Sequence, residues 1–248
     1  MKTPSPPPPP TTLLARLCAA VRELGWLDAA FYGASVLAPR CTGERCEIFK
    51  YDIVAQAIPP AAATPARART SAIAVRRVAV TEMAADGSAF LRPPSVLARR
   101  HGQGAECLAA YRDAELLGFM WFVCGPYDED EVRARFVPAD ALGAWDFDIE
   151  ILPPHRMGMA FARLWDAANG RLQARGVQWS YSRISAFNAP SRAAHRRAGA
   201  LTVGRTVFLR CGAWQWTLAS LAPYVHLSRD AASRPEFRLA APPLKNRT

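Results

Sequence analysis

The chain has 248 residues, of which 50% are hydrophobic, 10% aromatic and 21% charged, and its formal net charge is +10. This composition excludes an intrinsically disordered protein, because a chain this rich in apolar residues buries a core. The length suffices for one sizeable core, or for one core with an added lobe. No apolar run approaches the ~20 residues that cross a bilayer, so we expect no transmembrane segment.

The positive charge is concentrated in one segment. Residues 155–210 contain ten arginines and a single acidic residue, Asp166. Such a segment attracts anions, whether nucleic acid, anionic lipid or a phosphorylated small molecule. The alternative is a set of well-solvated helix faces. Arginines outnumber lysines by 28 to 3, which favours planar phosphate recognition or reflects a GC-rich genome.

The six cysteines form no CxxC pair and no zinc-ligand spacing, so we expect no metal site. Cys107 and Cys124 lie in apolar runs, where a reduced cysteine acts as a small hydrophobic residue. A disulfide between Cys41 and Cys46 is left open as an alternative. Reduced cysteines, and the lack of a signal-peptide pattern in residues 1–12, predict a cytoplasmic protein.

The first predicted elements are a proline-rich disordered tail over residues 1–12, then a helix, then a strand. Thr12 caps a helical pattern that extends to Pro39, and charges along it argue against insertion into a bilayer. An amphipathic helix lying in a membrane surface, and hence a peripheral membrane contact, stays open. A strand over 46–58 and a proline- and alanine-rich linker follow. We assign residues 13–70 to an N-terminal extension.

The next part of the chain predicts antiparallel strands. Residues 71–80 have the pattern of a strand, and two apolar runs around Asp113 predict a β-hairpin. An acidic stretch, 127–136, follows as a loop that leads into a short strand. Residues 144–152 (AWDFDIEIL) alternate as a half-buried strand does. We expect its apolar side chains on one face (Trp145, Phe147, Ile149 and Ile151) and its carboxylates on the outer face (Asp146, Asp148 and Glu150).

Helices and strands then alternate. A helix with an apolar stripe ends near Gly176, a strand covers 177–187, and a short basic helix precedes two further strands. This order predicts a mixed sheet of α+β or α/β type. We assign residues 71–222 to this domain and residues 223–248 to an irregular basic tail.

The junction PPHRMGMAF has the features of an anion site. Pro153 and Pro154 end the strand, and Gly158 allows a ligand to approach the backbone. The first-turn amides of the following helix have no internal acceptor, so these amides and the helix dipole attract an anion. Arg156 adds a full positive charge.

This junction resembles the phosphate loop of the GNAT superfamily of acyl-CoA-dependent N-acyltransferases. That loop has Gln or Arg, two residues, Gly, one residue, and then Gly or Ala. His155, Gly158 and Ala160 have this spacing, with His155 at the position of Gln or Arg. The usual arginine position is thus shifted, and Arg156 follows one residue later.

A second stretch, SAFNAPSRAAHRRAGA, resembles another motif of the same family. That motif runs from Asn through a small residue and an aromatic residue to Gly and a hydrophobic residue. The matching positions are Asn188, Ser191, His195, Gly199 and Ala200. The resemblance covers residues 71–218 and is strongest over 144–204.

The resemblance implies a GNAT-like twisted mixed sheet whose two central parallel strands splay apart at their C-terminal ends. Acetyl-CoA or another acyl-CoA lies in that cleft as co-substrate, and an amine acceptor attacks the thioester directly. The amide near Ile151 polarises the carbonyl. The implied cofactor-binding residues lie at the first strand end, in the phosphate loop and in the second motif: Ile151, Leu152, Arg156, Met157, Gly158, Met159, Ala160, Asn188, Ser191 and Arg192.

Direct transfer needs a base for the amine and an acid for the leaving thiolate. Glu150 is our first choice as base and Asp148 the second. The alternative is that all three carboxylates of this strand only solvate an outer face or pair with nearby arginines. His195 occupies the position where the family keeps a tyrosine, which makes it the candidate acid, or else a surface residue. Asn188 also suits the role of helix N-cap, and the two roles are compatible.

Two other functions stay open. One is a GNAT-fold protein without catalysis that binds an anionic partner or a membrane surface through its basic face. The other is a transferase that takes aminoacyl-tRNA, although the two motifs favour coenzyme A and nucleic acid is not the expected partner.

Overall fold

The computed structural model describes residues 21–59, 72–85, 90, 92–138 and 142–242. The strands are β1 (Cys46–Ala57), β2 (Ile73–Val78), β3 (Glu106–Arg112), β4 (Glu115–Val123), β5 (Tyr127–Asp128), β6 (Arg135–Pro138), β7 (Gly143–Ile151), β8 (Trp179–Ser185), β9 (Leu201–Cys211), β10 (Trp214–Ala219), β11 (Val225–Ser228) and β12 (Glu236–Leu239). The helices are α2 (Trp26–Thr42), α3 (Val80–Ala85), α4 (Pro94–Gly102), α5 (Ala160–Gln173) and α6 (Ala189–Arg197), with a 3₁₀ turn at Pro153–His155.

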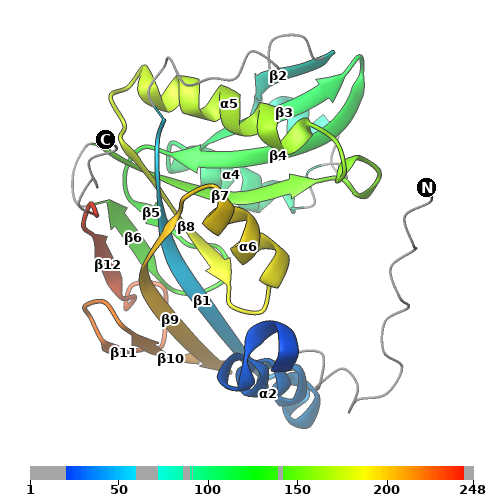
Figure 1. Cartoon of the computed structure of the whole chain (residues 1–248). Helices are drawn as coiled ribbons and strands as arrows, with labels where there is room; N and C mark the ends of the chain where they lie inside the picture. Colours follow the sequence, from blue (N-terminus) through cyan, green and yellow to red (C-terminus); the bar gives the residue numbers. More distant parts are fainter. Residues whose placement is uncertain (1–20, 60–71, 86–89, 91, 139–141, 243–248) are drawn as a thin grey trace.

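The strands form a large mixed sheet and a small one (Figure 1). The order in the large sheet is β11-β10-β9-β1-β8-β7-β4-β3-β2, and in the small sheet it is β12-β6-β5. This arrangement confirms the predicted α+β fold with a mixed sheet. The predicted hairpin is β3–β4, with Asp113 in its turn at a φ of 54°.

Helices cover both faces of the large sheet. On one face, α5 buries Leu164, Ala168 and Leu172 against β3 and β4, and α6 lies in front of β8 (Figure 1). On the other face, α4 and the small sheet enclose a core that includes Leu97 and Phe136. Among the described helices, none has the length and apolar character that crossing a membrane requires.

The strand β1 lies in the middle of the large sheet, although it comes from the N-terminal part of the chain. It pairs antiparallel with β8 on one side and with β9 on the other, and Ile53 and Ala55 are fully buried. The segment 13–70, predicted as an extension, therefore contributes a central strand. The segment 223–248, predicted as an irregular tail, contributes β11 and β12.

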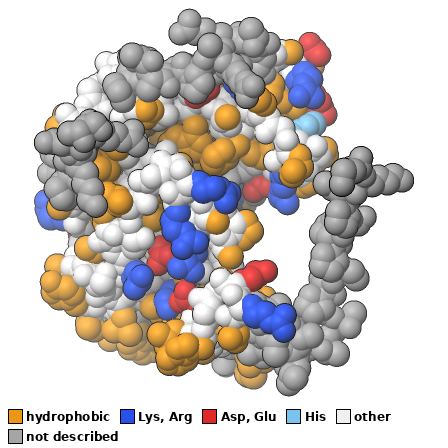
Figure 2. Space-filling view, in the orientation of Figure 1, with side chains coloured by type: hydrophobic (Ala, Val, Ile, Leu, Met, Phe, Trp, Pro, Cys, Tyr) orange, Lys and Arg blue, Asp and Glu red, His pale blue; other side chains and the backbone are white. Residues whose placement is uncertain are grey.

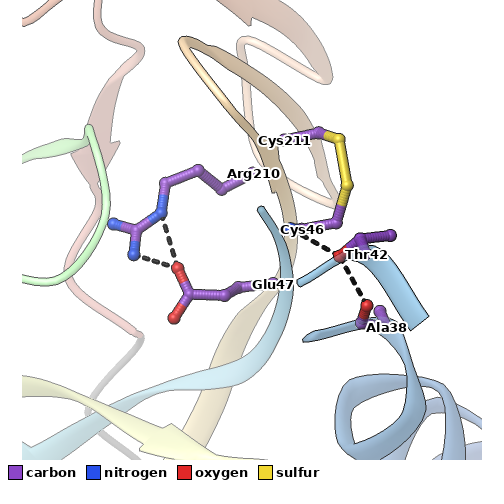
Figure 3. Close-up of a disulfide and its surroundings, with 6 residues drawn as sticks. All are labelled: Ala38, Thr42, Cys46, Glu47, Arg210 and Cys211. Carbon is purple, nitrogen blue, oxygen red and sulfur yellow. Dashed lines mark hydrogen bonds and ion pairs between the residues drawn. A yellow bond between two sulfur atoms is a disulfide. The ribbon is translucent and has the colours of Figure 1, made fainter. Parts of the chain in front are cut away.

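A disulfide joins Cys46, the first residue of β1, to Cys211, the last residue of β9 (Figure 3). The alternative pairing of Cys41 with Cys46 is wrong, because Cys41 is free and exposed. The expectation that the cysteines are all reduced is wrong as well. Antiparallel pairing of β1 with β9 brings two cysteines 165 residues apart into register, which their spacing in the sequence does not reveal.

Side-chain contacts next to the disulfide connect the same elements (Figure 3). Arg210 and Glu47, the next pair in the register, form an ion pair. The Thr42 hydroxyl at the end of α2 donates to the Ala38 carbonyl at 2.6 Å and accepts from the Cys46 amide at 3.0 Å. The start of β1 is thus attached both to β9 and to α2.

The strand β7 contains a bulge, which overturns the regular alternation that we predicted. Its register with β4 passes from Glu150–Phe119 to Phe147–Trp121, so β7 has one residue more than β4 between these pairs. Asp148 lies in the bulge with a left-handed φ of 49°, a conformation that Asp and Asn tolerate best among residues with a Cβ.

The bulge reverses which residues share a face. Trp145 and Phe147 belong to the core under α4, whereas Ile149 and Ile151 pack against the core under α5. The prediction of four apolar residues on one face is therefore wrong, and so is the prediction of three carboxylates together on the outer face. An extra residue exchanges the two faces of a strand beyond it.

Candidate active site

The parallel strands β7 and β8 pair over three residues only, from Gly143–Trp179 to Trp145–Tyr181. β7 then continues to Ile151 and β8 to Ser185 without pairing to each other. The strands therefore diverge at their C-terminal ends, as the resemblance implies. We call this gap the opening.

The end of β7 presents backbone groups to the opening. The Leu152 amide donates to the Leu117 carbonyl of β4 at 2.9 Å. Because amides alternate in direction along a strand, the Ile151 amide points away from β4 and toward the opening. Of these two predicted cofactor-binding residues, Ile151 offers its amide and Leu152 does not.

A buried carboxylate lies where the strands part. Asp146 follows the last parallel pair directly and is only 2% exposed. The Ser180 hydroxyl of β8 donates to its Oδ2 atom at 2.5 Å. Burial raises the pKa of Asp146 to about 6, against hydrogen bonds from Ser180 and Ser182 and the attraction of His195, which lower it.

Asp148 lies on the opposite face, bound to two arginines of the segment around α4. Arg92 binds both of its oxygens at 3.0 Å, and the buried Arg100 binds Oδ2 at 2.7 Å. Burial alone would raise the pKa of Asp148, but these hydrogen bonds and charges outweigh it and lower that pKa below its ordinary value. Asp148 is thus held as a carboxylate.

Glu150, the first-choice base, lies near the end of β7 and is partly exposed. It forms an ion pair with Arg156 at 3.0 Å, and Arg156 also donates to the Ile151 carbonyl at 3.2 Å. The predicted base and the predicted phosphate-binding arginine are therefore each other's partners. Arg156 is more than half exposed, so the pair can open when an anion binds.

The predicted phosphate loop precedes α5 and is open to solvent. The Gly158 amide donates to the His155 carbonyl at 3.0 Å, and Met157 is fully exposed. Met159 is at the N-cap position without a side-chain cap, and α5 begins at Ala160. The first-turn amides of α5 therefore have no helical or side-chain capping acceptor, which is the arrangement that the predicted anion site requires.

A groove of about 210 Å³ separates α5 from α6. Its walls are Phe161, Ala162 and Trp165 on α5, and His195 and Ala198 on α6. His195 also lines a second cavity, of about 130 Å³, over β1 and β9. The two predicted motifs thus flank one groove.

The orientation of the His195 ring restricts its chemistry. Its Nδ1 atom lies 2.9 Å from the Ser191 carbonyl, which can only accept, so Nδ1 carries a proton. Nε2 is then an acceptor in the neutral ring and a donor only in the imidazolium.

The start of α6 is capped as predicted. Asn188 Oδ1 accepts from the Ser191 amide at 3.0 Å. Arg192, predicted to contact the cofactor, instead binds Asp28 of α2 at 3.2 Å and Asp52 of β1 at 3.0 Å. It ties α6 to the N-terminal elements.

Arg192 is typical of the basic segment. Seven of its ten arginines form ion pairs with carboxylates: Arg156, Arg171, Arg175, Arg183, Arg192, Arg205 and Arg210. Nearly all of these carboxylates come from other parts of the chain, and acidic side chains lie among the basic ones in Figure 2. The excess charge of this segment is largely neutralised within the fold.

A cavity of about 200 Å³ lies on the face opposite α6, at the other side of the opening. The acidic stretch contributes Glu129, Asp130 and Glu131 to its lining, together with Asp148 and Arg183. The opening thus has a groove on one face and a charged cavity on the other.

Two parts of this site do not follow from the sequence pattern. Alternation places Asp146 on one face with Asp148 and Glu150, because it does not reveal a bulge. Gln56 and Asp52 of β1 line the groove and its neighbouring cavity, although β1 seemed to belong to an extension. The apolar pattern of β1 predicted a strand, but nothing local predicted its neighbours.

Several solved structures that are described as GNAT proteins are similar to this chain at low sequence identity. No protein-family model and no curated protein matches it. Similar solved structures include a tandem GNAT protein from the clavulanic acid biosynthesis pathway, at 19% identity and a TM-score of 0.47, covering 70% of this chain and 57% of that one. A protein of Novosphingobium aromaticivorans assigned to the GNAT acetyltransferases has 15% identity and a TM-score of 0.46, covering 66% and 64%.

A conserved Staphylococcus epidermidis protein of unknown function has 11% identity and a TM-score of 0.45, covering 71% of this chain and 67% of that one. The chain spans less than two thirds of the length of the clavulanic acid pathway and Novosphingobium structures.

Proposed function

We propose that the protein is an acyl-CoA-dependent N-acyltransferase that transfers an acyl group, acetyl in the simplest case, to an amine by direct attack. One observation carries the proposal. The diverging strands β7 and β8 frame an opening with a buried carboxylate, Asp146, at its base, and the opening is flanked by the uncapped start of α5 and by α6.

In this proposal the acyl-CoA lies in the groove between α5 and α6. The amides from Met157 to Ala160 bind its pyrophosphate, and Arg156 leaves Glu150 to assist. The Ile151 amide, which points into the opening, hydrogen-bonds the thioester carbonyl and polarises it. Asn188 serves as the cap of α6 and holds this wall of the groove in place.

The amine nitrogen attacks the thioester carbon, the carbon–sulfur bond breaks, and the amine loses one proton while the thiolate gains one. Glu150 takes the amine proton, since it is partly exposed, whereas the arginines that hold Asp148 ionised make Asp148 a weaker base. His195 donates the thiolate proton from Nε2, a step that uses the imidazolium form because Nδ1 is bound to the Ser191 carbonyl.

The acceptor enters from the cavity on the opposite face, so that amine and thioester meet across the opening. The ion pairs of the basic segment weigh against the rival function, a non-catalytic protein with a broad anion-binding face. They also weigh against a tRNA substrate, because few of the arginines are left to contact phosphates.

The test is isothermal titration calorimetry with acetyl-CoA, followed by an assay of thiol release with a panel of primary amines. We expect binding at micromolar concentrations and amine-dependent thiol release. The absence of any binding at tens of micromolar would overturn the proposal. Binding without turnover of any amine would favour the non-catalytic rival.

A further inference from the structure

The polar side chains of strand β10 are buried and its apolar side chains are exposed, which is the reverse of the usual arrangement. Gln215 and Thr217 are fully buried, whereas Trp214, Trp216 and Leu218 are 42%, 43% and 55% exposed. A strand with one face in water normally presents its polar residues there. The exposed face of β10 therefore has the composition of a buried one.

The same face continues across the neighbouring strands. Trp216 stands opposite Leu209 of β9 and Leu227 of β11, and Leu218 stands opposite Val225. Cross-strand partners share a face, so these side chains form one continuous surface. We call it the apolar strip, and its residues are Leu209, Trp214, Trp216, Leu218, Val225 and Leu227. Hydrophobic side chains gather over β9, β10 and β11 in Figure 2.

The buried polar face fixes this orientation. The Gln215 side chain accepts from the Arg133 amide and donates to the Arg133 carbonyl, both at 2.8 Å. Beneath β9 and β10, Phe208 packs on Phe237 of the small sheet. A one-residue slip that turned the tryptophans inward would break these contacts, so the strip faces outward by construction.

The strip is large enough to be an interface. Its six side chains expose roughly 600 Å² together, the upper end of what a monomer leaves open and close to the ~800 Å² that one partner contributes to a standard interface. It contains no charged residue, and Arg229 borders it by stacking on Trp214 at 5.5 Å.

We propose that the apolar strip is a homodimer interface, in which it packs face to face on the strip of a second copy of the chain. An uncharged surface of adjacent aromatic and aliphatic rows is complementary to itself about a two-fold axis and needs no partner of opposite charge. The strip lies on β9 to β11, away from the opening between β7 and β8. Dimerisation is therefore independent of the proposed acyl transfer.

Sedimentation equilibrium of the full chain from about 1 to 100 µM tests the proposal. We expect a dimer in the wild type, and a monomer when Trp216→Glu and Leu218→Glu are combined. Leu227→Lys, on the neighbouring strand, should have the same effect. Trp26→Glu is the matched control, because Trp26 is an exposed tryptophan on α2, and that variant should stay dimeric.

Circular dichroism identifies any variant that fails to fold, and the wild type alone still decides the question. Its tryptophan fluorescence should shift to the red on dilution, as Trp214 and Trp216 become exposed to water. A wild type that is monomeric at 100 µM would overturn the proposal, and so would a dimer that survives the strip substitutions. A monomer that binds neutral lipid vesicles would overturn it in favour of a lipid surface as the partner of the strip. A monomer whose strip is shielded by residues 1–20 would overturn it in favour of that segment.

Discussion

Asp146 and Asp148 are two residues apart on β7, yet their carboxylates lie on opposite faces of the sheet. The bulge at Asp148 produces this arrangement. Asp146 is bound by serines and has a raised pKa, whereas Asp148 is bound by arginines and has a lowered pKa. The two groups should therefore affect stability in opposite directions as the pH changes.

For Asp146, the folded protein binds the proton more tightly than the unfolded chain does. Stability should therefore fall as the pH rises from about 4 to about 6, and Asp146→Asn should remove this dependence. The free energy of unfolding of the variant minus that of the wild type should be about 3 kcal/mol larger at pH 8 than at pH 4. Urea unfolding across this range measures it, and parallel profiles of the two proteins would contradict it.

For Asp148, the lowered pKa contributes stability that is present above the unfolded pKa and is lost as the pH falls. Asp148→Asn keeps the left-handed backbone but removes one of the two carboxylates that bind the buried Arg100, which then keeps only Asp130. We expect a loss of about 1–2 kcal/mol at pH 7 that shrinks in acid. Glu82→Gln, in the exposed Arg76–Glu82 pair, is the control and should leave stability unchanged.

Gly158→Glu should weaken acetyl-CoA binding about tenfold or more, because it places a carboxylate in the proposed phosphate loop. A Cβ at this position would also come within 3.2 Å of the His155 carbonyl. Gly170→Glu adds the same charge to the exposed side of α5, where a Cβ meets nothing within 4 Å. Calorimetry compares the two, and equal affinities would refute the assignment of the loop.

His195→Ala should lower kcat about 100-fold with little change in KM, if the imidazolium protonates the thiolate. His226→Gln on β11 is the control, remote from the opening. Unchanged turnover in His195→Ala across the pH range would remove His195 from the mechanism.

Cys211→Ser should reduce stability by about 3–5 kcal/mol, because the disulfide closes a loop of 165 residues. A reductant should lower the stability of the wild type to that of Cys211→Ser, and it should leave the stability of Cys211→Ser unchanged. Cys41→Ser, at a free exposed cysteine, should change nothing. Thiol titration of the denatured chain should find two fewer thiols before reduction than after it. Equal numbers would contradict the bond.

The sequence predicted those features that depend on neighbours along the chain. Asn188 followed by Pro190 indicated the start of α6, and the structure has that cap. The runs around Asp113 predicted the β3–β4 hairpin. The resemblance of the two motifs to the GNAT superfamily implied that β7 and β8 diverge, and these strands pair over three residues only.

The features that the sequence did not reveal depend on pairing between distant segments. The bulge at Asp148 requires the register of β4, and the disulfide of Cys46 requires the register of β9. The outward face of β10 was equally hidden, because the alternation of Trp214 to Leu218 suggests that the tryptophans are the buried side. The opposite orientation is observed, because the buried Gln215 side chain forms hydrogen bonds with the backbone of Arg133.

The central place of β1 has a consequence for how the chain folds. This strand is synthesised early, but its partners β8 and β9 follow more than a hundred residues later. Until they appear, β1 has no hydrogen-bonding neighbour on these two edges and exposes its apolar middle, Ile53 to Ala55, which is a hazard for aggregation. Because such distant contacts close slowly, we expect the insertion of β1 to be a late step and its docking to complete the sheet.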